Sequence, residues 1–242
     1  MDIRDAKIIV TGGASGLGAA CVAYFRGQGA KVSVFDLTAT GHDAYAVDVT
    51  SDQAAARAVS QASSAMGGLT AVVNCAGIVA GARVVGKSGP HDLGLFRKTI
   101  DINLVGSFNI ARLAAAEMAN NTPNGDGERG VIINTSSVAA FDGQKGQAAY
   151  AASKAGIAGM SLPMARDMAA LGIRVCAIAP GLFLTPMLEG LGEEMIAGLS
   201  RDVVFPKRLG RPEEFAQLAA FILQAAYLNG ETIRLDGALR MQ

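Results

Sequence analysis

Short runs rich in β-branched residues alternate with longer alanine-rich, amphipathic stretches along almost the whole chain of 242 residues. This alternation is typical of parallel strands joined by crossover helices, because a tight turn cannot connect parallel neighbours. The runs predict strands at 7–11, 31–35, 44–47, 70–74, 130–136, 173–179 and 231–235. The stretches between them predict helices at 15–28, 52–67, 92–120, 147–171, 184–200 and 212–226. We therefore expect an α/β fold with one Rossmann-type, doubly wound parallel sheet of about seven strands and helices on both faces.

The alternation runs without a break, so residues 1–242 are treated as a single domain. About eight residues separate the second and third predicted strands, too few for a crossover helix, and we expect a loop at 38–43 instead. The polar, glycine- and asparagine-rich stretch 119–130 predicts a surface loop.

Charge and cysteine content exclude several classes of function. Lysine plus arginine and aspartate plus glutamate are 21 each, so no net field favours nucleic acid or an anionic membrane. No uncharged apolar stretch reaches the ~18 residues that a membrane span needs. Cys21, Cys75 and Cys176 are odd in number and widely spaced, which argues against a disulfide framework and favours a cytoplasmic protein. His42 and His91 lie in loop-like surroundings without a matching cluster of carboxylates or cysteines, and we expect no metal site.

A glycine-rich loop follows the first predicted strand directly and opens the first predicted helix. Its glycines at Gly12, Gly16 and Gly18 would let backbone approach a pyrophosphate closely, and the helix N-terminus would offer unpaired N–H groups to the anion. An ordinary glycine-rich turn is the alternative, since isolated glycine patterns are weak signals.

An acidic residue, Asp36, ends the second predicted strand 18 residues after Gly18. A carboxylate there can accept hydrogen bonds from the adenosine ribose hydroxyls, and it would repel a 2′-phosphate. Leu37 supplies no compensating positive charge, so the cofactor is predicted to be NAD. Asp48 and Val49 end the third strand, where they could meet the adenine; capping of the next helix is the alternative for this pair.

Tyr150 and Lys154 are four residues apart in a predicted helix, so both project from one face. A nearby ammonium can stabilise phenolate, which makes such a tyrosine a candidate general base. Ser137 follows a predicted strand at the edge where ligands bind in α/β sheets. Asn103 interrupts an apolar stripe, and its amide needs a buried partner.

Together these residues resemble the short-chain dehydrogenase/reductase family from residue 7 onward. The resemblance rests on TGGASGLG, Asp36, Asn74-Cys75-Ala76-Gly77, Asn103, Ser137, the Tyr150/Lys154 pair and Pro180-Gly181. Cys75 departs from the asparagine common in the family. The resemblance implies a catalytic tetrad of Asn103, Ser137, Tyr150 and Lys154, with Asn103 anchoring a water that links Lys154 to solvent. It also implies cofactor contacts at Gly12, Ser15, Gly16, Leu17, Gly18, Asp36, Asp48, Val49, Asn74, Cys75, Ala76, Gly77, Tyr150, Lys154, Pro180, Gly181, Phe183 and Thr185.

Within that family the chain most resembles the type II 3-hydroxyacyl-CoA dehydrogenases, also known as type 10 17β-hydroxysteroid dehydrogenases. The resemblance rests on GVIINTSSVAAFDGQKGQAAY, IAPGLFLTP, FPKRLG and LNGETIRLDGALRMQ. It implies a homotetramer that oxidises 3-hydroxyacyl-CoA thioesters with NAD, Tyr150 taking the hydroxyl proton and Ser137 holding the substrate oxygen. The chain departs from this subgroup at 38–43, near the adenosine end, and at 184–204, which bears on acyl chain length.

Three other functions stay open at this point. A 3-oxoacyl-carrier-protein reductase shares the fold and the tetrad, and a hydroxysteroid or other secondary-alcohol dehydrogenase would use the same chemistry. A dinucleotide-binding sensor or scaffold would be expected to lack Tyr150 or Lys154.

Two segments have an ordinary structural interpretation beside a functional one. Residues 181–205 carry Met187, Leu188, Met195 and Leu199 at near-helical spacing, so the segment is either a substrate-covering lid or packed core. Arg83 and Lys87 are available for the phosphates of coenzyme A, or are solvated loop charges.

Overall fold

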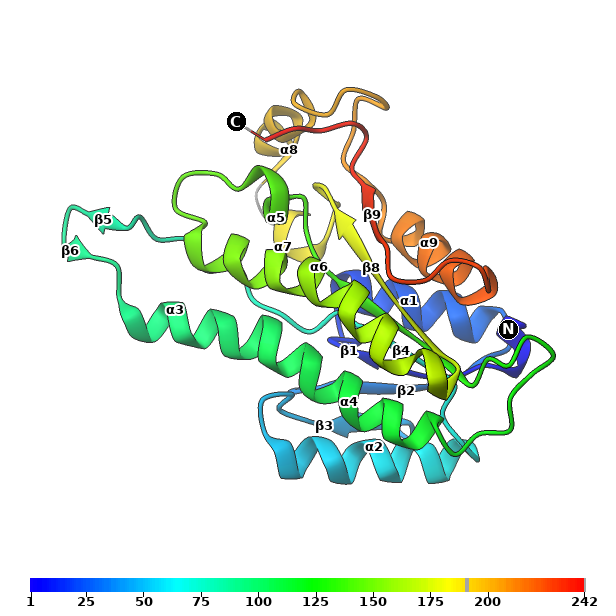
Figure 1. Cartoon of the computed structure of the whole chain (residues 1–242). Helices are drawn as coiled ribbons and strands as arrows, with labels where there is room; N and C mark the ends of the chain where they lie inside the picture. The colour runs from blue at the N-terminus through cyan, green and yellow to red at the C-terminus, as the bar shows by residue number, and fades with distance from the viewer. Residues whose placement is uncertain (190–191, 242) are drawn as a thin grey trace.

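Seven parallel strands form one twisted sheet in the computed structural model, which describes residues 1–189 and 192–241 (Figure 1). The strands are β1 (Lys7–Thr11), β2 (Lys31–Asp36), β3 (Ala44–Ala46), β4 (Ala71–Asn74), β7 (Gly130–Thr135), β8 (Ile173–Pro180) and β9 (Thr232–Leu235). Their order across the sheet is β3-β2-β1-β4-β7-β8-β9. The predicted α/β fold with a doubly wound parallel sheet is confirmed.

Five main helices cover the sheet, and both faces are buried. On one face lie α1 (Gly16–Gly27) and α9 (Pro212–Gln224), and on the other lie α2 (Asp52–Met66), α4 (Gly106–Met118) and α6 (Ala148–Met168). Successive strand side chains point to opposite faces, so Ile8 and Val10 pack with the first pair while Ile9 packs with the second set. This double burial explains why the central strands are almost continuously apolar.

The predicted helix at 92–120 has a different geometry at its centre. It consists of α3 (Leu93–Ile100), a π-helical turn at Asp101–Val105 and α4, which follow one another without a break. π-turns inside α-helices are uncommon and frequent at functional sites. Asn103, singled out from the sequence, is at the middle of this turn and is completely buried.

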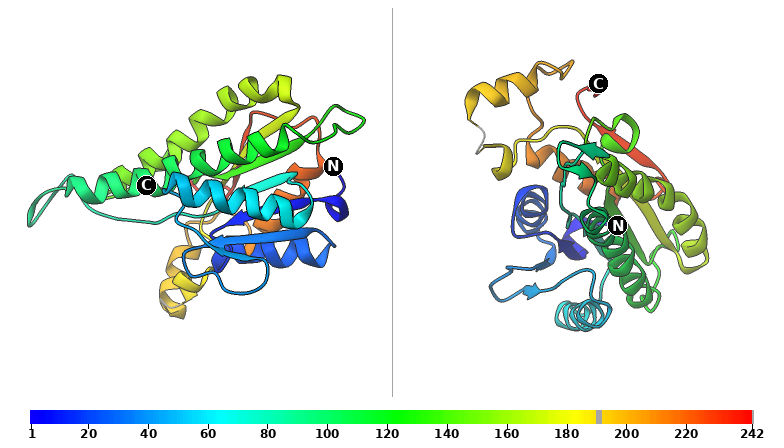
Figure 2. Two further views of the ribbon diagram at one scale, coloured as in Figure 1. Left: turned by 90° about the horizontal axis from the view of Figure 1, so that it is seen from below. Right: turned by 90° about the vertical axis from the view of Figure 1, so that its left-hand side faces the viewer.

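The remaining elements are short, and most surround the carboxyl ends of the strands. They are a 3₁₀ turn at Ile3–Asp5, the hairpin of β5 (Val85–Gly86) and β6 (Gly89–Pro90), α5 (Ala139–Asp142), α7 (Pro186–Glu189), α8 (Glu193–Ser200) and a 3₁₀ turn at Ala169–Leu171. The loops expected at 38–43 and 119–130 are present. The β5–β6 hairpin, which the sequence did not predict, projects well beyond the body of the molecule (Figure 2).

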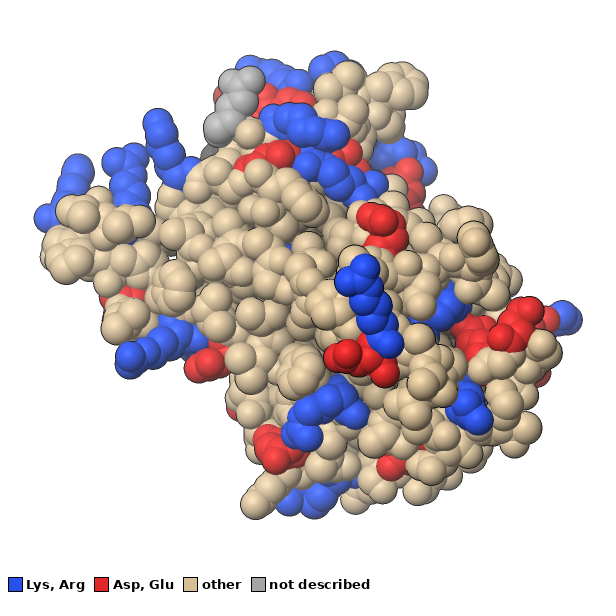
Figure 3. Space-filling model, in the orientation of Figure 1, with Lys and Arg blue, Asp and Glu red and all other residues tan. Residues whose placement is uncertain are grey.

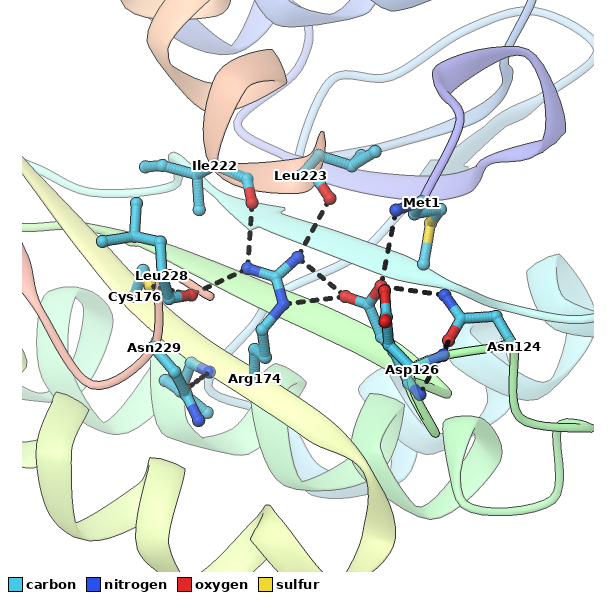
Figure 4. Close-up of polar contacts among 11 residues, drawn as sticks. Met1, Asn124, Asp126, Arg174, Cys176, Ile222, Leu223, Leu228 and Asn229 are labelled. Atoms are coloured by element: carbon cyan, nitrogen blue, oxygen red, sulfur yellow. Dashed lines mark hydrogen bonds and ion pairs between the residues drawn. The ribbon is translucent and has the colours of Figure 1, made fainter. Parts of the chain in front are cut away.

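At the opposite, amino end of the sheet, a buried ion pair joins β8 to the loop before β7 (Figure 4). Arg174 Nε lies 2.8 Å from Glu128 Oε1, and the other guanidinium nitrogens donate to backbone carbonyls at the end of α9 and beyond. None of the helices in the described ranges is both long and apolar enough to cross a bilayer.

Candidate active site

A cavity of about 1040 Å³ opens at the carboxyl edge of the sheet, over β1 and β4. After β1 the chain winds outward to β2 and β3 and then crosses back to β4, so the helices on either side of this point lie on opposite faces of the sheet. Ligands of open α/β sheets bind at such a switch point. Among the residues predicted from the sequence, the cavity is lined by Gly12, Ser15, Gly16, Leu17, Gly18, Asp36, Asp48, Val49, Cys75, Ala76, Gly77, Ser137, Tyr150, Lys154, Pro180, Gly181, Phe183 and Thr185.

At one side of this cavity the backbone of the glycine loop passes so close to its neighbours that two positions have no room for a Cβ atom. Gly12 has a φ of +64°, and a Cβ there would lie 2.9 Å from the backbone nitrogen of Ala76. A Cβ on Gly18 would lie 2.2 Å from the Gly12 carbonyl oxygen, so this glycine lets α1 pack directly on the loop. Ser15, the residue before α1, caps no N–H with its side chain. The loop and the free amides of α1 therefore fit a pyrophosphate.

Asp36 lies at the end of β2, beside the glycine loop. Its Oδ2 accepts a hydrogen bond from the Ala14 N–H at 3.2 Å and its Oδ1 one from the Thr38 N–H at 3.3 Å, which orient the carboxylate. Leu37 is 71 % exposed and leaves the carboxylate without a nearby cation on that side. This arrangement fits an adenosine ribose better than a ribose that carries a 2′-phosphate.

Asp48 and Val49 line the same end of the cavity. Asp48 Oδ1 accepts from the N–H of Thr50 at 2.9 Å and so fixes the turn before α2. The cap of α2 itself is Ser51, whose hydroxyl accepts from the Ala54 N–H. Asp48 is thus not the capping residue, and its position against the adenosine end stays available for cofactor contact.

Tyr150 and Lys154 lie one turn apart on α6, at the other end of the cavity. Lys154 Nζ donates to the Thr135 carbonyl at 2.7 Å and lies 5.8 Å from the centre of the Tyr150 ring. Burial lowers the pKa of Lys154 to about 8. Burial also raises the pKa of Tyr150, although the Ser137 hydroxyl acts in the opposite direction. In this state the desolvation of the phenol outweighs the lowering that the lysine was expected to produce.

Two serines at the end of β7 connect the sheet to this helix. Ser136 Oγ donates to the Lys154 carbonyl at 2.8 Å, which holds α6 against the strand. Ser137 Oγ accepts from the Ala139 N–H at 3.1 Å at the start of α5 and also faces the cavity. A hydroxyl held in this way is placed to contact a substrate oxygen beside Tyr150.

Asn74 and Asn103 were predicted as site residues, but both are buried behind the cavity wall. The Asn74 amide donates to Asn134 Oδ1 and to the Ser107 carbonyl, and its strand position directs it into the sheet and α4. Asn103 Oδ1 accepts from the Ile78 N–H at 2.8 Å, and its Nδ2 donates to the Ile78 carbonyl and to Ser153 Oγ, each at 3.0 Å. Asn103 thereby has the buried partners that its polarity required, and it positions the 76–78 loop against α6.

The 181–205 segment contributes several apolar residues to the cavity. Leu182, Phe183, Pro186 and Leu188 line it, and Leu199 is half-buried on α8. Of the predicted stripe, the side chains of Met187 and Met195 lie outside the described residues, as do positions 190–191. Residues 181–188 therefore contribute to one wall of the cavity, whereas none of the described residues 192–205 lines it.

Several residues that line or support the cavity were not predicted from the sequence, and Thr11, Thr135 and Gln147 are the ones with a clear role. Thr11 Oγ1 accepts from the N–H groups of Cys75 and Ala76, each at 3.1 Å, and so shapes the loop after β4. The Thr135 carbonyl holds Lys154, and Gln147 lines the cavity one turn before Tyr150. Only Gln147 could have been found in advance, since it precedes Tyr150 by three residues in a predicted helix.

Arg83 is exposed just before β5 and Lys87 is exposed in the β5–β6 turn, in a region where lysine and arginine side chains project from the left of the molecule (Figure 3). Neither takes part in a salt bridge among the described residues. The same described ranges contain no group of three histidine, cysteine or acidic side chains that could hold a metal ion.

Comparison with known proteins places this geometry in a family. The family model for short chain dehydrogenase matches residues 6–196. The chain belongs to the short-chain dehydrogenase family. A human relative named 3-hydroxyacyl-CoA dehydrogenase type-2 is 49 % identical, with 99 % of this chain and 97 % of that protein covered. A protein of the same name from Drosophila melanogaster is 48 % identical, with 99 % of each chain covered.

A solved structure supports the same relationship for this short-chain dehydrogenase. The crystal structure of a 3-hydroxyacyl-CoA dehydrogenase type-2 from Mycobacterium avium matches with a TM-score of 0.92 at 42 % identity, covering 99 % of this chain and 97 % of that one. Family and relatives together imply a nicotinamide dinucleotide cofactor and a small-molecule substrate. The glycine loop and the cavity described above fit such a cofactor.

Proposed function

We propose that this short-chain dehydrogenase is an NAD-dependent 3-hydroxyacyl-CoA dehydrogenase that oxidises the 3-hydroxyl to the 3-oxo group reversibly. The observation that carries the proposal is one cavity with a dinucleotide-type glycine loop and Asp36 at one end and Ser137, Tyr150 and Lys154 at the other. The substrate class is supported by identity of 49 % over nearly the whole length to a relative named for that activity.

The chemistry needs a base, a hydroxyl donor and a cation, and the cavity contains each. Tyr150 as phenolate would take the proton of the substrate hydroxyl, and Ser137 would hold the same oxygen by a hydrogen bond. NAD, when bound, supplies the hydride acceptor. Lys154, fixed by the Thr135 carbonyl, would stabilise phenolate and contact the nicotinamide ribose. Because burial raises the pKa of Tyr150, formation of phenolate needs a nearby positive charge, and Lys154 is the cation one helical turn away.

The choice of NAD over NADP rests on Asp36. The carboxylate is oriented by the Ala14 and Thr38 N–H groups and would face a 2′-phosphate with like charge. Asp36→Asn removes that charge with little change of shape. We expect this variant to gain affinity for NADPH about tenfold or more, while its affinity for NADH falls.

The rival functions differ from this proposal in separate features. A 3-oxoacyl-carrier-protein reductase would use the same residues but a macromolecular substrate, and preference for NADPH would favour it. A hydroxysteroid or other secondary-alcohol dehydrogenase would need no coenzyme A. A sensor or scaffold would not need Tyr150 and Lys154 together in the cavity, where the structure has them.

The resemblance that suggests the substrate also suggests a homotetramer, and the three widely spaced cysteines favour the cytoplasm. We propose the assembly and the compartment on these two separate grounds. Light scattering coupled to size-exclusion chromatography tests the first, and a single-chain mass would overturn it. Fractionation of cells tests the second.

The central experiment is reduction of acetoacetyl-CoA with NADH or NADPH, compared with acetoacetyl-carrier-protein and a steroid ketone. We expect the fastest turnover with NADH and acetoacetyl-CoA. Tyr150→Phe should lower kcat by about 10²- to 10⁴-fold while NADH still binds. Near wild-type turnover in folded Tyr150→Phe, or a clear preference for NADPH, would overturn the proposal.

A further inference from the structure

Gln147 is a cavity residue to which the mechanism above gives no part. It immediately precedes α6, and residues 147, 150 and 154 are spaced at three and four, so Gln147, Tyr150 and Lys154 share one face of this helix. All three line the cavity. Along that face the order is fixed: Lys154 is innermost, against the Thr135 carbonyl, and Gln147 is one turn outward from Tyr150.

The amide of Gln147 is held in one orientation. Its Oε1 accepts a hydrogen bond from the Gln144 N–H at 3.0 Å, so the oxygen is occupied. The Nε2 group, which can only donate, makes no hydrogen bond within residues 1–189 and 192–241. Gln147 is half-buried and lines the cavity, so this donor is available to a ligand acceptor there.

The spacing matches a ligand with a second oxygen close to the one that reacts. Three residues of α-helix rise about 4.5 Å, so Gln147 lies about that far along the helix axis from Tyr150. In a 3-hydroxyacyl thioester the reacting hydroxyl is on C3 and the thioester carbonyl is on C1, with one carbon between them. A simple secondary alcohol has no such acceptor.

We infer that Gln147 is a specificity-determining residue whose amide Nε2 donates a hydrogen bond to the thioester carbonyl of the substrate. This inference rests on the proposed function, since it names how the same cavity recognises a β-oxygenated acyl thioester. The hydrogen bond fixes the acyl chain while Ser137 and Tyr150 hold the oxygen at C3. It also places the carrier end of the thioester toward the cavity mouth.

The test compares two unreactive ligands that differ only at that carbonyl. Butyryl-CoA has the thioester carbonyl, and S-butyl-CoA is the thioether without it; neither has a 3-hydroxyl. Calorimetry would measure the dissociation constant of each in the presence of NADH, with wild type, Gln147→Met, Gln147→Glu and Gln144→Met. Gln147→Glu keeps the acceptor for the Gln144 N–H and loses the donor. Gln144→Met is the matched control, because it changes an exposed side chain and keeps that N–H.

We expect wild type and Gln144→Met to bind butyryl-CoA about three- to tenfold more tightly than S-butyl-CoA, the range for one hydrogen bond between neutral groups. The preference should disappear in Gln147→Met and Gln147→Glu, with thermal unfolding close to wild type. A preference retained in both variants, or absent from wild type, overturns the inference. Failure of the proposed function is distinguishable from this, because wild type would then fail to reduce acetoacetyl-CoA with NADH.

Discussion

Lys154 is the residue at which folding and catalysis make opposite demands. Burial lowers its pKa from 10.5 to about 8, so the folded protein binds this proton more weakly than the unfolded chain does. Below pH 8 both states are protonated and the charged, buried amine destabilises the fold fully. Between pH 8 and 10.5 only the unfolded chain keeps the proton, so this destabilisation decreases as the pH rises, and above 10.5 it is absent.

Comparison with Lys154→Met isolates this effect. We expect the free energy of unfolding of wild type, relative to the variant, to rise by about 2 to 3 kcal/mol between pH 7 and pH 10.5. Urea unfolding of the cofactor-free protein at several pH values measures it. Lys145→Met, at an exposed lysine, should show no such pH dependence. A constant difference between wild type and Lys154→Met would contradict the low pKa.

Residues that directly follow a predicted strand could be placed in the fold from the sequence. The glycine loop, Asp36 and Ser137 each follow a strand whose apolar run is unmistakable, so their meeting at one edge follows from the fold. Asn74 also ends a strand, but the face to which its side chain points depends on the pleat. The Asn74 side chain points to the face that α4 covers. The role of Thr135 is carried by its backbone carbonyl, which no side-chain pattern can indicate.

Helices and strands with a regular hydrophobic periodicity were predicted from the sequence. A π-turn and a short hairpin were missed, because they leave no mark on that periodicity. The long helix over 92–120 was expected to be uniform, whereas Asp101–Val105 form a π-turn. The turn has helical backbone angles on both sides and the same apolar spacing, so hydrophobic periodicity does not reveal it. The β5–β6 hairpin has two-residue strands, too short for an alternation to show.

The start of the 181–205 segment lies against the cavity, and we expect it to limit the size of the substrate. Leu188 on α7 lines the cavity, so a longer acyl chain would pack against it. We expect Leu188→Ser to raise KM about four- to fifteenfold for a ten-carbon 3-hydroxyacyl-CoA and to leave the four-carbon substrate within twofold, because about one or two methylene contacts are lost. Steady-state kinetics with a chain-length series measure this.

Val204→Ser is the control for that substitution, since Val204 is exposed in the same segment and does not line the cavity. Equal effects of Leu188→Ser on short and long substrates would show that the segment is packed core and not a substrate-covering lid.

At the scale of the whole molecule, stability and chemistry are located at opposite edges of the sheet. The buried pair of Arg174 and Glu128 (Figure 4) lies at the amino ends of β8 and β7, whereas the cavity lies at the carboxyl edge of the sheet. Glu128→Gln would leave the guanidinium buried without its counter-charge. We expect a loss of about 3 kcal/mol in the free energy of unfolding with kcat unchanged. Chemical unfolding and steady-state assays together test this separation.

Asp126→Asn gives the control, because Asp126 is an exposed acid in the same loop. It should change stability by less than about 0.5 kcal/mol. A fall in kcat for Glu128→Gln at a temperature where the variant stays folded would show that the two edges are coupled.

Two exposed cations, Arg83 and Lys87, lie beside and within the β5–β6 hairpin of a protein whose net charge is zero. Neither has a salt-bridge partner among the described residues, and coenzyme A carries its phosphates at the end far from the thioester (Figure 3). If these phosphates lie near the hairpin, reversing either charge weakens an attraction that salt also screens. We expect Arg83→Glu and Lys87→Glu each to raise KM for acetoacetyl-CoA about two- to tenfold at low ionic strength, with a smaller effect at high salt.

Two controls separate this effect from a general loss of activity. The KM for the N-acetylcysteamine thioester, which has no phosphate, should be unchanged in both variants. The KM for acetoacetyl-CoA should be unchanged in Arg57→Glu, which alters an exposed residue on α2. Equal KM values for all variants would mean that Arg83 and Lys87 are solvated charges with no part in binding.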